Sequence, residues 1–242
     1  MTVQNVFSRV EKKYLLSSAQ QKALIGRIGG RLRPDPYGRT RIDSLYYDTP
    51  DWRLLRASIE KPVYREKLRL RSYGAPNEES VVYCELKRKV KDIVYKRREG
   101  MPYALALRYL QRETEAPEPS QITRELDWFL AFYGSLRPAI LISCDRVALY
   151  GREEGGLRLT FDRDIRWESE RPILGQGTAG RTLLEPGQTL LEIKIPGAMP
   201  FWLARELDDL AIYPIGFSKV GNAYRELMRL GTAAEKGDVN CA

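Results

Sequence analysis

The chain contains no histidine among its 242 residues, and its only cysteines are Cys84, Cys144 and Cys241. Histidine is the commonest general base and the commonest transition-metal ligand in proteins, so a metal here has to be held by carboxylates. Carboxylates favour hard cations such as Mg²⁺ or Mn²⁺. Three cysteines at wide, uneven spacing form neither a disulfide framework nor a zinc site.

Long hydrophobic runs are also missing. No apolar stretch approaches the roughly 18 residues that a membrane helix needs, and no cleavable hydrophobic leader is recognisable. The content of 43% hydrophobic and 30% charged residues is typical of a soluble globular protein. We therefore expect a reduced, cytoplasmic protein without a membrane segment.

Positive charge is in excess, with 40 Lys and Arg residues against 32 Asp and Glu, a formal net charge of +8 and a pI near 9.4. This balance indicates an anionic partner such as nucleic acid, a polyphosphate or an acidic surface. The densest basic stretches, residues 65–71 and 83–89, alternate charged and apolar residues, which predicts two half-buried strands. The first strand places Arg65, Lys67, Arg69 and Arg71 on one face, and the second does the same for Glu85, Lys87 and Lys89. Because like charges opposite one another destabilise a sheet, we expect an anion on this surface; the alternative is a solvated outer face.

The remaining patterns predict an α+β protein. Further strands are expected at residues 6–16, 41–48, 94–98, 139–150, 157–162 and 189–195, with a loop at 33–38. Helices are expected from Ser17 or Ser18 through Leu24, Ile28 and Leu32, at 54–58, 102–110 and 122–133, through Met199–Leu210, and from Ser218 to a stop at Gly231. We expect one domain over residues 1–231 and a disordered tail over 232–242. About eight strands can close into an antiparallel barrel, and a charged lumen would then require a bound polyanion.

A family resemblance rests on several of these segments. The run from Arg9 to Tyr14 resembles the Glu-x-Glu-x-Lys signature of the triphosphate tunnel metalloenzymes, with Arg9 in place of the first glutamate. That departure resembles the VTC branch, the polyphosphate polymerase domains, and so do the segments 46–49, 66–74, 94–98, 143–146, 190–194 and 217–219. The resemblance extends from about residue 7 to about residue 228.

The resemblance implies an eight-stranded antiparallel tunnel with flanking helices. In it, the terminal phosphoryl group of ATP or another triphosphate is transferred to a growing inorganic polyphosphate chain, with Mn²⁺ or Mg²⁺ as cofactor. The implied phosphate-binding catalytic residues are Lys13, Arg69, Arg71, Lys87, Lys96, Arg146, Arg158 and Lys219. Further substrate-binding candidates are Arg9, Arg65, Lys67, Lys89, Arg97, Lys194 and Ser218, and the metal candidates are Glu192, Glu11 and Glu85. The family's second lysine, three positions before Lys219, is replaced by Gly216.

Two other functions remain open at this point. One is hydrolysis of tripolyphosphate or a nucleoside triphosphate in the same architecture, and the other is non-catalytic binding of polyphosphate, inositol phosphates or nucleic acid. A terminal phosphate is already an anionic nucleophile, whereas water must be activated; a chain without histidine therefore favours transfer. Basic residues confined to alternating strand positions argue against nucleic acid, which needs an open groove with exposed aromatics. Asp48 is expected to end a strand in a turn, and Tyr46 to pack in the core.

Overall fold

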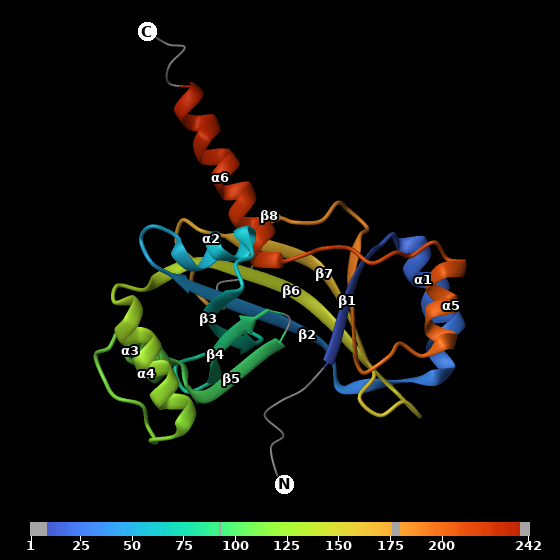
Figure 1. Cartoon of the computed structure of the whole chain (residues 1–242), viewed down its shortest axis with the longest axis horizontal. Helices are drawn as coiled ribbons and strands as arrows, with labels where there is room; N and C mark the ends of the chain where they lie inside the picture. The colour runs from blue at the N-terminus through green and yellow to red at the C-terminus, as the bar shows by residue number, and fades with distance from the viewer. Residues whose placement is uncertain (1–8, 92, 176–179, 238–242) are drawn as a thin grey trace. The chain divides into compact units, whose positions relative to one another are not determined.

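The structure is a computed structural model that describes residues 9–91, 93–175 and 180–237 (Figure 1). The strands are β1 Arg9–Leu16, β2 Leu32–Asp48, β3 Tyr64–Tyr73, β4 Val81–Val90, β5 Ile93–Pro102, β6 Arg137–Gly151, β7 Arg158–Glu168, β8 Arg181–Thr182 and β9 Thr189–Pro196. The helices are α1 Ser18–Ile28, α2 Arg53–Glu60, α3 Tyr103–Leu110, α4 Gln121–Tyr133, α5 Phe201–Asp209 and α6 Lys219–Gly237, with a 3-10 turn at Gly29–Arg31.

Hydrogen bonds connect the strands in the order β1-β9-β7-β6-β2-β3-β4-β5, and the short β8 pairs with β7 as a ninth strand. The pairings β1–β9, β7–β9, β3–β4 and β4–β5 are antiparallel. The predicted α+β class, with an antiparallel path of eight strands and flanking helices, is confirmed. The hydrogen-bonded path is open, with β1 and β5 as its ends.

The chain divides into two compact units, and the division falls within β2, β6 and β7. The first unit comprises residues up to Ile42, Ser143–Ile165 and Leu184–Phe217. Helices α1 and α5 pack against each other in this unit (Figure 1). Its core joins inward-facing residues of β1, β7 and β9 to the apolar faces of these helices, among them Tyr14, Leu24, Leu159, Leu191 and Leu203.

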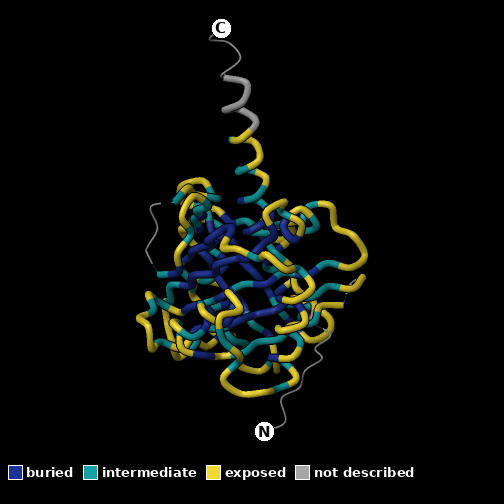
Figure 2. Tube along the Cα trace, turned by 90° about the vertical axis from the view of Figure 1, so that its left-hand side faces the viewer, coloured by how far each residue is buried: buried dark blue, intermediate teal, exposed yellow. Residues whose placement is uncertain are grey.

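The second unit comprises Asp43–Ile142, Arg166–Leu183 and the residues from Ser218 onward. Helices α3 and α4 pack on β4 and β5, and α2 packs on β3 and α6. The core contains alternate residues of β3 and β4 and one face of α4, including Leu68, Leu70, Cys84, Leu86 and Phe129. Figure 2 shows the buried positions concentrated along the strands and the exposed ones in the connections. Because strand side chains alternate, this packing directs the basic residues of β3, and Lys87 and Lys89 of β4, to the opposite face.

Three predicted boundaries were wrong. The expected loop at 33–38 belongs to β2. Pro34 and Pro36 are two residues apart, so both missing N–H groups fall on one side of the strand, and the other side keeps its donors. Leu32 begins β2 instead of continuing α1. Gly231 does not stop the last helix, which continues to Gly237, because one glycine lowers helix stability by only about 1 kcal/mol.

Asp48 does end a strand, and its buried carboxylate then caps the next helix. Oδ1 accepts hydrogen bonds from the amides of Thr49 and Leu54, and Oδ2 accepts one from Leu55, each at 2.8 Å. The bonds from Leu54 and Leu55 satisfy amides of the first turn of α2 that have no partner within the helix. Among the helices of the described residues, none is both long enough and apolar enough to cross a membrane.

Candidate functional site: two cationic clusters

The first cluster lies on the basic face of β3, β4 and β5 in the second unit. Antiparallel pairing places Lys67 opposite Lys87, and Lys87 opposite Lys96, so three lysines occupy one row across three strands. The next row holds Arg69, Glu85 and Arg98. Directly opposite residues share a face at about 4.5–5.5 Å between Cβ atoms, so the predicted alternation is confirmed in β3 and β4 and extends into β5.

Glu85 is the buried centre of this cluster, and its side chain is 1% exposed. Its Oε2 accepts from Arg69, with Nε at 2.6 Å, and its Oε1 accepts from Arg98 Nε and Lys96 Nζ, both at 2.7 Å. Arg71 Nε lies 3.9 Å from Oε2. Burial opposes the charge, but Arg69, Arg71, Lys96 and Arg98 together lower the pKa of Glu85 far below its ordinary value. Glu85 therefore remains a carboxylate and partly neutralises four cations.

Two aromatic hydroxyl groups complete this arrangement. Tyr46 is 8% exposed, and its hydroxyl accepts from Arg69 Nη1 at 3.1 Å. Burial raises the pKa of Tyr46, but Arg69, Lys67 and Arg71 outweigh it and lower the pKa to about 8. The hydroxyl of Tyr73 accepts from Arg98 Nη2 at 2.6 Å. The arginines are thus held in fixed positions before any ligand arrives.

Lys96 has an unusual electrostatic environment. Its side chain is 44% exposed, yet Nζ lies 2.7 Å from the buried carboxylate of Glu85. The loss of solvent around Nζ, aided by Arg69 and opposed by Glu85, lowers the pKa of Lys96 to about 7. An additional anion at this position would favour the charged form of Lys96.

Arg97 lies on the opposite face of the same strand. Its Nε donates to Glu125 of α4 at 3.1 Å, and Glu125 also accepts from Arg88 of β4 at 2.6 Å. Arg88 in turn donates to the buried Glu66 at 3.0 Å. The structure therefore separates Arg97 from the row of Lys67, Lys87 and Lys96, because an odd shift along a strand reverses the face.

The second cluster lies in the first unit, on β1, β9 and β7. Lys13, Glu192 and Thr160 are directly opposite one another in one row, and Glu11, Lys194 and Arg158 form the next row. Lys13 Nζ donates to the carbonyl of Phe217 at 2.9 Å and lies 3.7 Å from Glu192 Oε1 and 3.4 Å from Glu11 Oε1. The lysines of this cluster thus lie between carboxylates of neighbouring strands.

Arg146 of β6 enters the same cluster. Its Nε and Nη2 donate to the two carboxylate oxygens of the buried Asp162 at 2.5 and 2.6 Å, and Nη2 also lies 3.7 Å from Glu192 Oε2. Burial opposes the charge, but Asp162 raises the pKa of Arg146 above its ordinary value. Lys194 Nζ lies 3.6 Å from Glu192 Oε2, and Arg158 Nη2 lies 3.7 Å from Asp35 Oδ2.

The carboxylates of this cluster fit a divalent metal only in part. In the described residues there is no group of three or more His, Cys, Asp or Glu side chains that can hold a metal ion. Mg²⁺ and similar ions, however, often bind through one or two carboxylates and take their other ligands from phosphate oxygens and water. Glu192 fits this mode together with Glu11, because both carboxylates approach Lys13 Nζ, at 3.7 and 3.4 Å.

The remaining predicted residues lie near the ends of strands and helices. Lys89 is opposite Arg65, whose Nη1 donates to the carbonyl of Pro62 at 3.0 Å. Ser218 Oγ accepts from the amide of Gly221 at 3.2 Å in the first turn of α6, and Lys219 is the first residue of that helix. The backbone of Arg9 is opposite Pro196 at the start of β1.

Sequence analysis missed Arg98, Tyr46, Thr160 and the ion-pair role of Asp162. The signal for Arg98 was available, because Lys96 and Arg98 are two residues apart in one strand and share a face. Thr160 and Asp162 follow Arg158 by two and four residues in β7, so they share its face of the strand. The hydroxyl of Tyr46 had no such signal, because its contact with Arg69 joins β2 to β3.

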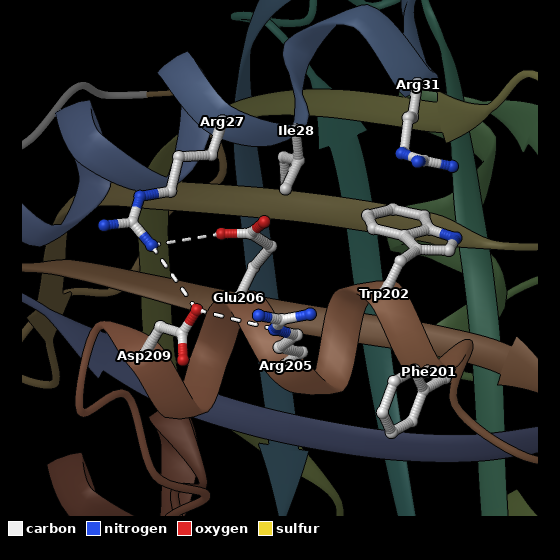
Figure 3. Close-up of a pocket in the computed structure, with 8 residues that line it drawn as sticks. All are labelled: Arg27, Ile28, Arg31, Phe201, Trp202, Arg205, Glu206 and Asp209. Carbon is white, nitrogen blue, oxygen red and sulfur yellow. Dashed lines mark hydrogen bonds and ion pairs between the residues drawn. The ribbon is translucent and has the colours of Figure 1, made fainter.

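A cavity of about 310 Å³ in the first unit contains none of the predicted site residues (Figure 3). It lies between α1 and α5 and is lined by Arg27, Trp202 and Arg205, among others. Two of its charges are carboxylates that pair with Arg27: Arg27 Nη1 lies 3.2 Å from Glu206 Oε2 and 3.9 Å from Asp209 Oδ2. The two cationic clusters are therefore better candidates for phosphate binding.

Comparisons with known proteins agree with the fold. A model of the VTC domain family matches residues 8–228, which include parts of both units. A search of curated proteins finds no significant match. A candidate adenylate cyclase from Bacillus halodurans is similar in structure, with a TM-score of 0.52 and 15% identity over 89% of this chain and 96% of that chain. A candidate adenylyl cyclase from Hippeastrum, described as having a dominant triphosphatase activity, gives a TM-score of 0.51 and 19% identity over 87% and 92%. At these identities the likeness shows the fold alone.

Proposed function

Because the chain belongs to the VTC domain family, we propose that it transfers the terminal phosphoryl group of ATP or another nucleoside triphosphate to inorganic polyphosphate. The observation that carries this proposal is the row of Lys67, Lys87 and Lys96 beside the row of Arg69, Glu85 and Arg98. Like charges directly opposite one another destabilise a sheet. A polyphosphate chain, with a negative charge on each phosphate, offsets that repulsion along consecutive strands.

The chemistry requires little beyond positioning and charge neutralisation. An anionic terminal oxygen of the polyphosphate attacks the γ-phosphorus, the bond from that phosphorus to the β,γ-bridging oxygen breaks, and the nucleoside diphosphate leaves. Arginine forks match two phosphate oxygens at once, a role that Arg69, Arg71 and Arg146 would fill, while lysines supply compact charges. No general base is needed, in agreement with the absence of histidine.

Glu192 and Glu11 are our proposed metal ligands, and Glu85 is not. Each oxygen of Glu85 is already within 2.7 Å of arginine or lysine nitrogen atoms, so a divalent cation would have to displace them. Lys13, Arg146 and Lys194 lie farther from the oxygens of Glu192, at 3.6 to 3.7 Å. A bound Mg²⁺ or Mn²⁺ would neutralise charge on the phosphate oxygens.

A second candidate function is triphosphate hydrolysis. It is favoured by the triphosphatase activity described for the Hippeastrum protein, which shares the fold. Hydrolysis in this chain would require a carboxylate to activate water, and the partly exposed Glu11, with 34% of its side chain accessible, is the best placed.

One assay separates these functions. The pure protein is incubated with ATP and Mn²⁺, and the products are resolved as long polyphosphate and free phosphate, with an EDTA sample and an Arg69→Ala variant as controls. Long polyphosphate that is lost in both controls supports the proposal. Free phosphate alone would replace it with hydrolysis. No turnover, with tripolyphosphate still raising the melting temperature, would make the protein a binder.

A further inference from the structure

Thr160 is a buried residue of the second cluster, and its side chain carries a hydroxyl. Its neighbours in β7, Leu159 and Phe161, belong to the core, so Thr160 faces the other side of the sheet with Arg158 and Asp162. It is 1% exposed and directly opposite Glu192, which is opposite Lys13. The hydroxyl is therefore in the row that contains the proposed metal carboxylate and a proposed phosphate ligand.

Two polar atoms on this face of β7 are buried without a hydrogen-bond partner in the described residues: Thr160 Oγ1 and Arg158 Nε. Buried polar groups in folded proteins are nearly always hydrogen-bonded, so exceptions need an explanation. These two residues are two positions apart and next to Glu192 and Lys194 of β9. Arg158 Nε can only donate and the Thr160 hydroxyl can donate as well as accept, so one acceptor group such as a phosphate satisfies both.

We propose that Thr160 is a further substrate-positioning residue whose hydroxyl donates a hydrogen bond to a phosphate oxygen of the bound triphosphate. This inference rests on the proposed function, because it places the triphosphate beside Lys13 and Glu192. The hydroxyl is a neutral donor among charged groups, so it fixes the orientation of the phosphate without adding charge.

The test combines affinity with stability. Thr160→Val removes the hydroxyl and keeps the shape, and Thr160→Ser retains it. Thr160→Val is expected to bind tripolyphosphate about tenfold more weakly than wild type, with Mn²⁺ and with EDTA alike, since one hydrogen bond to a charged group is lost. Its melting temperature without ligand should equal or exceed that of wild type, because the variant no longer buries an unsatisfied hydroxyl. Thr160→Ser should retain most of the affinity.

Thr189→Val is the matched control. Thr189 is buried in β9, and its Oγ1 donates to Gln21 at 2.7 Å and accepts from Arg163 at 3.3 Å. This variant should melt at a lower temperature than wild type and bind tripolyphosphate unchanged.

Wild-type affinity in Thr160→Val would overturn the assignment of Thr160, and so would a weaker affinity accompanied by a lower melting temperature. A loss confined to the Mn²⁺ samples would assign the hydroxyl to the metal instead. If the wild-type protein itself does not bind tripolyphosphate, the proposed function fails together with the inference.

Discussion

The buried carboxylate of Asp162 holds the guanidinium of Arg146 at two points, through Nε at 2.5 Å and Nη2 at 2.6 Å. Asp162 is fully buried and Arg146 nearly so, with exposed side-chain fractions of 0% and 14%. A planar fork matched to a carboxylate fixes the orientation of the arginine. The same Nη2 lies 3.7 Å from Glu192 Oε2, so Asp162 fixes the guanidinium beside the carboxylate that we propose as a metal ligand.

Replacing Asp162 with Asn should therefore destabilise the protein strongly. The change leaves a buried arginine without its counter-charge, and such losses typically cost about 3–5 kcal/mol. Urea unfolding measures the loss in the free energy of unfolding. Asp164→Asn is the control: that carboxylate is 41% exposed and 3.5 Å from Arg41, so its loss should cost less than about 1 kcal/mol. Similar midpoints for the two variants would contradict the importance of the Arg146–Asp162 pair.

Glu85→Gln tests the counter-charge of the first cluster. Burial opposes ionisation, but the four neighbouring cations lower the pKa of Glu85 in the folded state, so its stabilisation is present above the unfolded pKa, about 4.3, and is lost as the pH falls below it. The variant should be clearly less stable than wild type at pH 7, and the difference should narrow below about pH 4. Thermal melting at both pH values measures this difference.

The Glu85→Gln variant also tests whether tripolyphosphate binds at the first cluster. Tripolyphosphate supplies the negative charge that the Glu85→Gln variant has lost, so it should raise the melting temperature of the variant more than that of wild type. Sodium chloride at matched ionic strength is the control for screening. Equal shifts in the two proteins would show that the anion does not bind at this cluster.

Alternation in the sequence was enough to predict the faces of β3 and β4, because the buried Leu68 and Leu70 alternate with basic residues in β3, and the buried Cys84 and Leu86 flank Glu85 in β4. It did not predict that Glu85 would be buried. A carboxylate and a lysine on one face of a strand are equally typical of an ion pair that is exposed to solvent. Arg146 could not be assigned a face, since β6 is apolar on both sides around it and its partner, Asp162, lies on another strand. Contacts between strands distant in sequence depend on register, which a local pattern does not contain.

Lys96 and Arg97 provide a direct test of which face of β5 binds the anion, because they are consecutive in one strand. Lys96→Ala should weaken tripolyphosphate binding about tenfold or more, since it removes a cation from the lysine row. Arg97→Ala should leave the affinity unchanged and lower stability modestly, because it breaks the contact with Glu125. Isothermal titration measures the affinities. A larger loss in Arg97→Ala than in Lys96→Ala would place the site on the helix-covered face.

Glu192→Gln tests the carboxylate that we propose as a metal ligand. Its side chain is 8% exposed, and Lys13, Lys194 and Arg146 all lie within 3.7 Å. Removing one negative charge from this group of cations should leave tripolyphosphate binding in EDTA as tight as in wild type or tighter. Turnover with Mn²⁺ should fall by about 100-fold or more, the effect of losing one electrostatic contact to the transition state.

The control for Glu192→Gln is Glu153→Gln, which changes the same charge on an exposed residue between β6 and β7. It should alter neither turnover nor binding. Titration of the Mn²⁺ dependence completes the experiment: wild type should bind tripolyphosphate more tightly as Mn²⁺ is added, and Glu192→Gln should lose that gain. If Glu192→Gln keeps near-normal metal-dependent turnover, Glu192 is not the ligand. Glu11, which shares Lys13 and Lys194 with it, would then be the carboxylate to replace next.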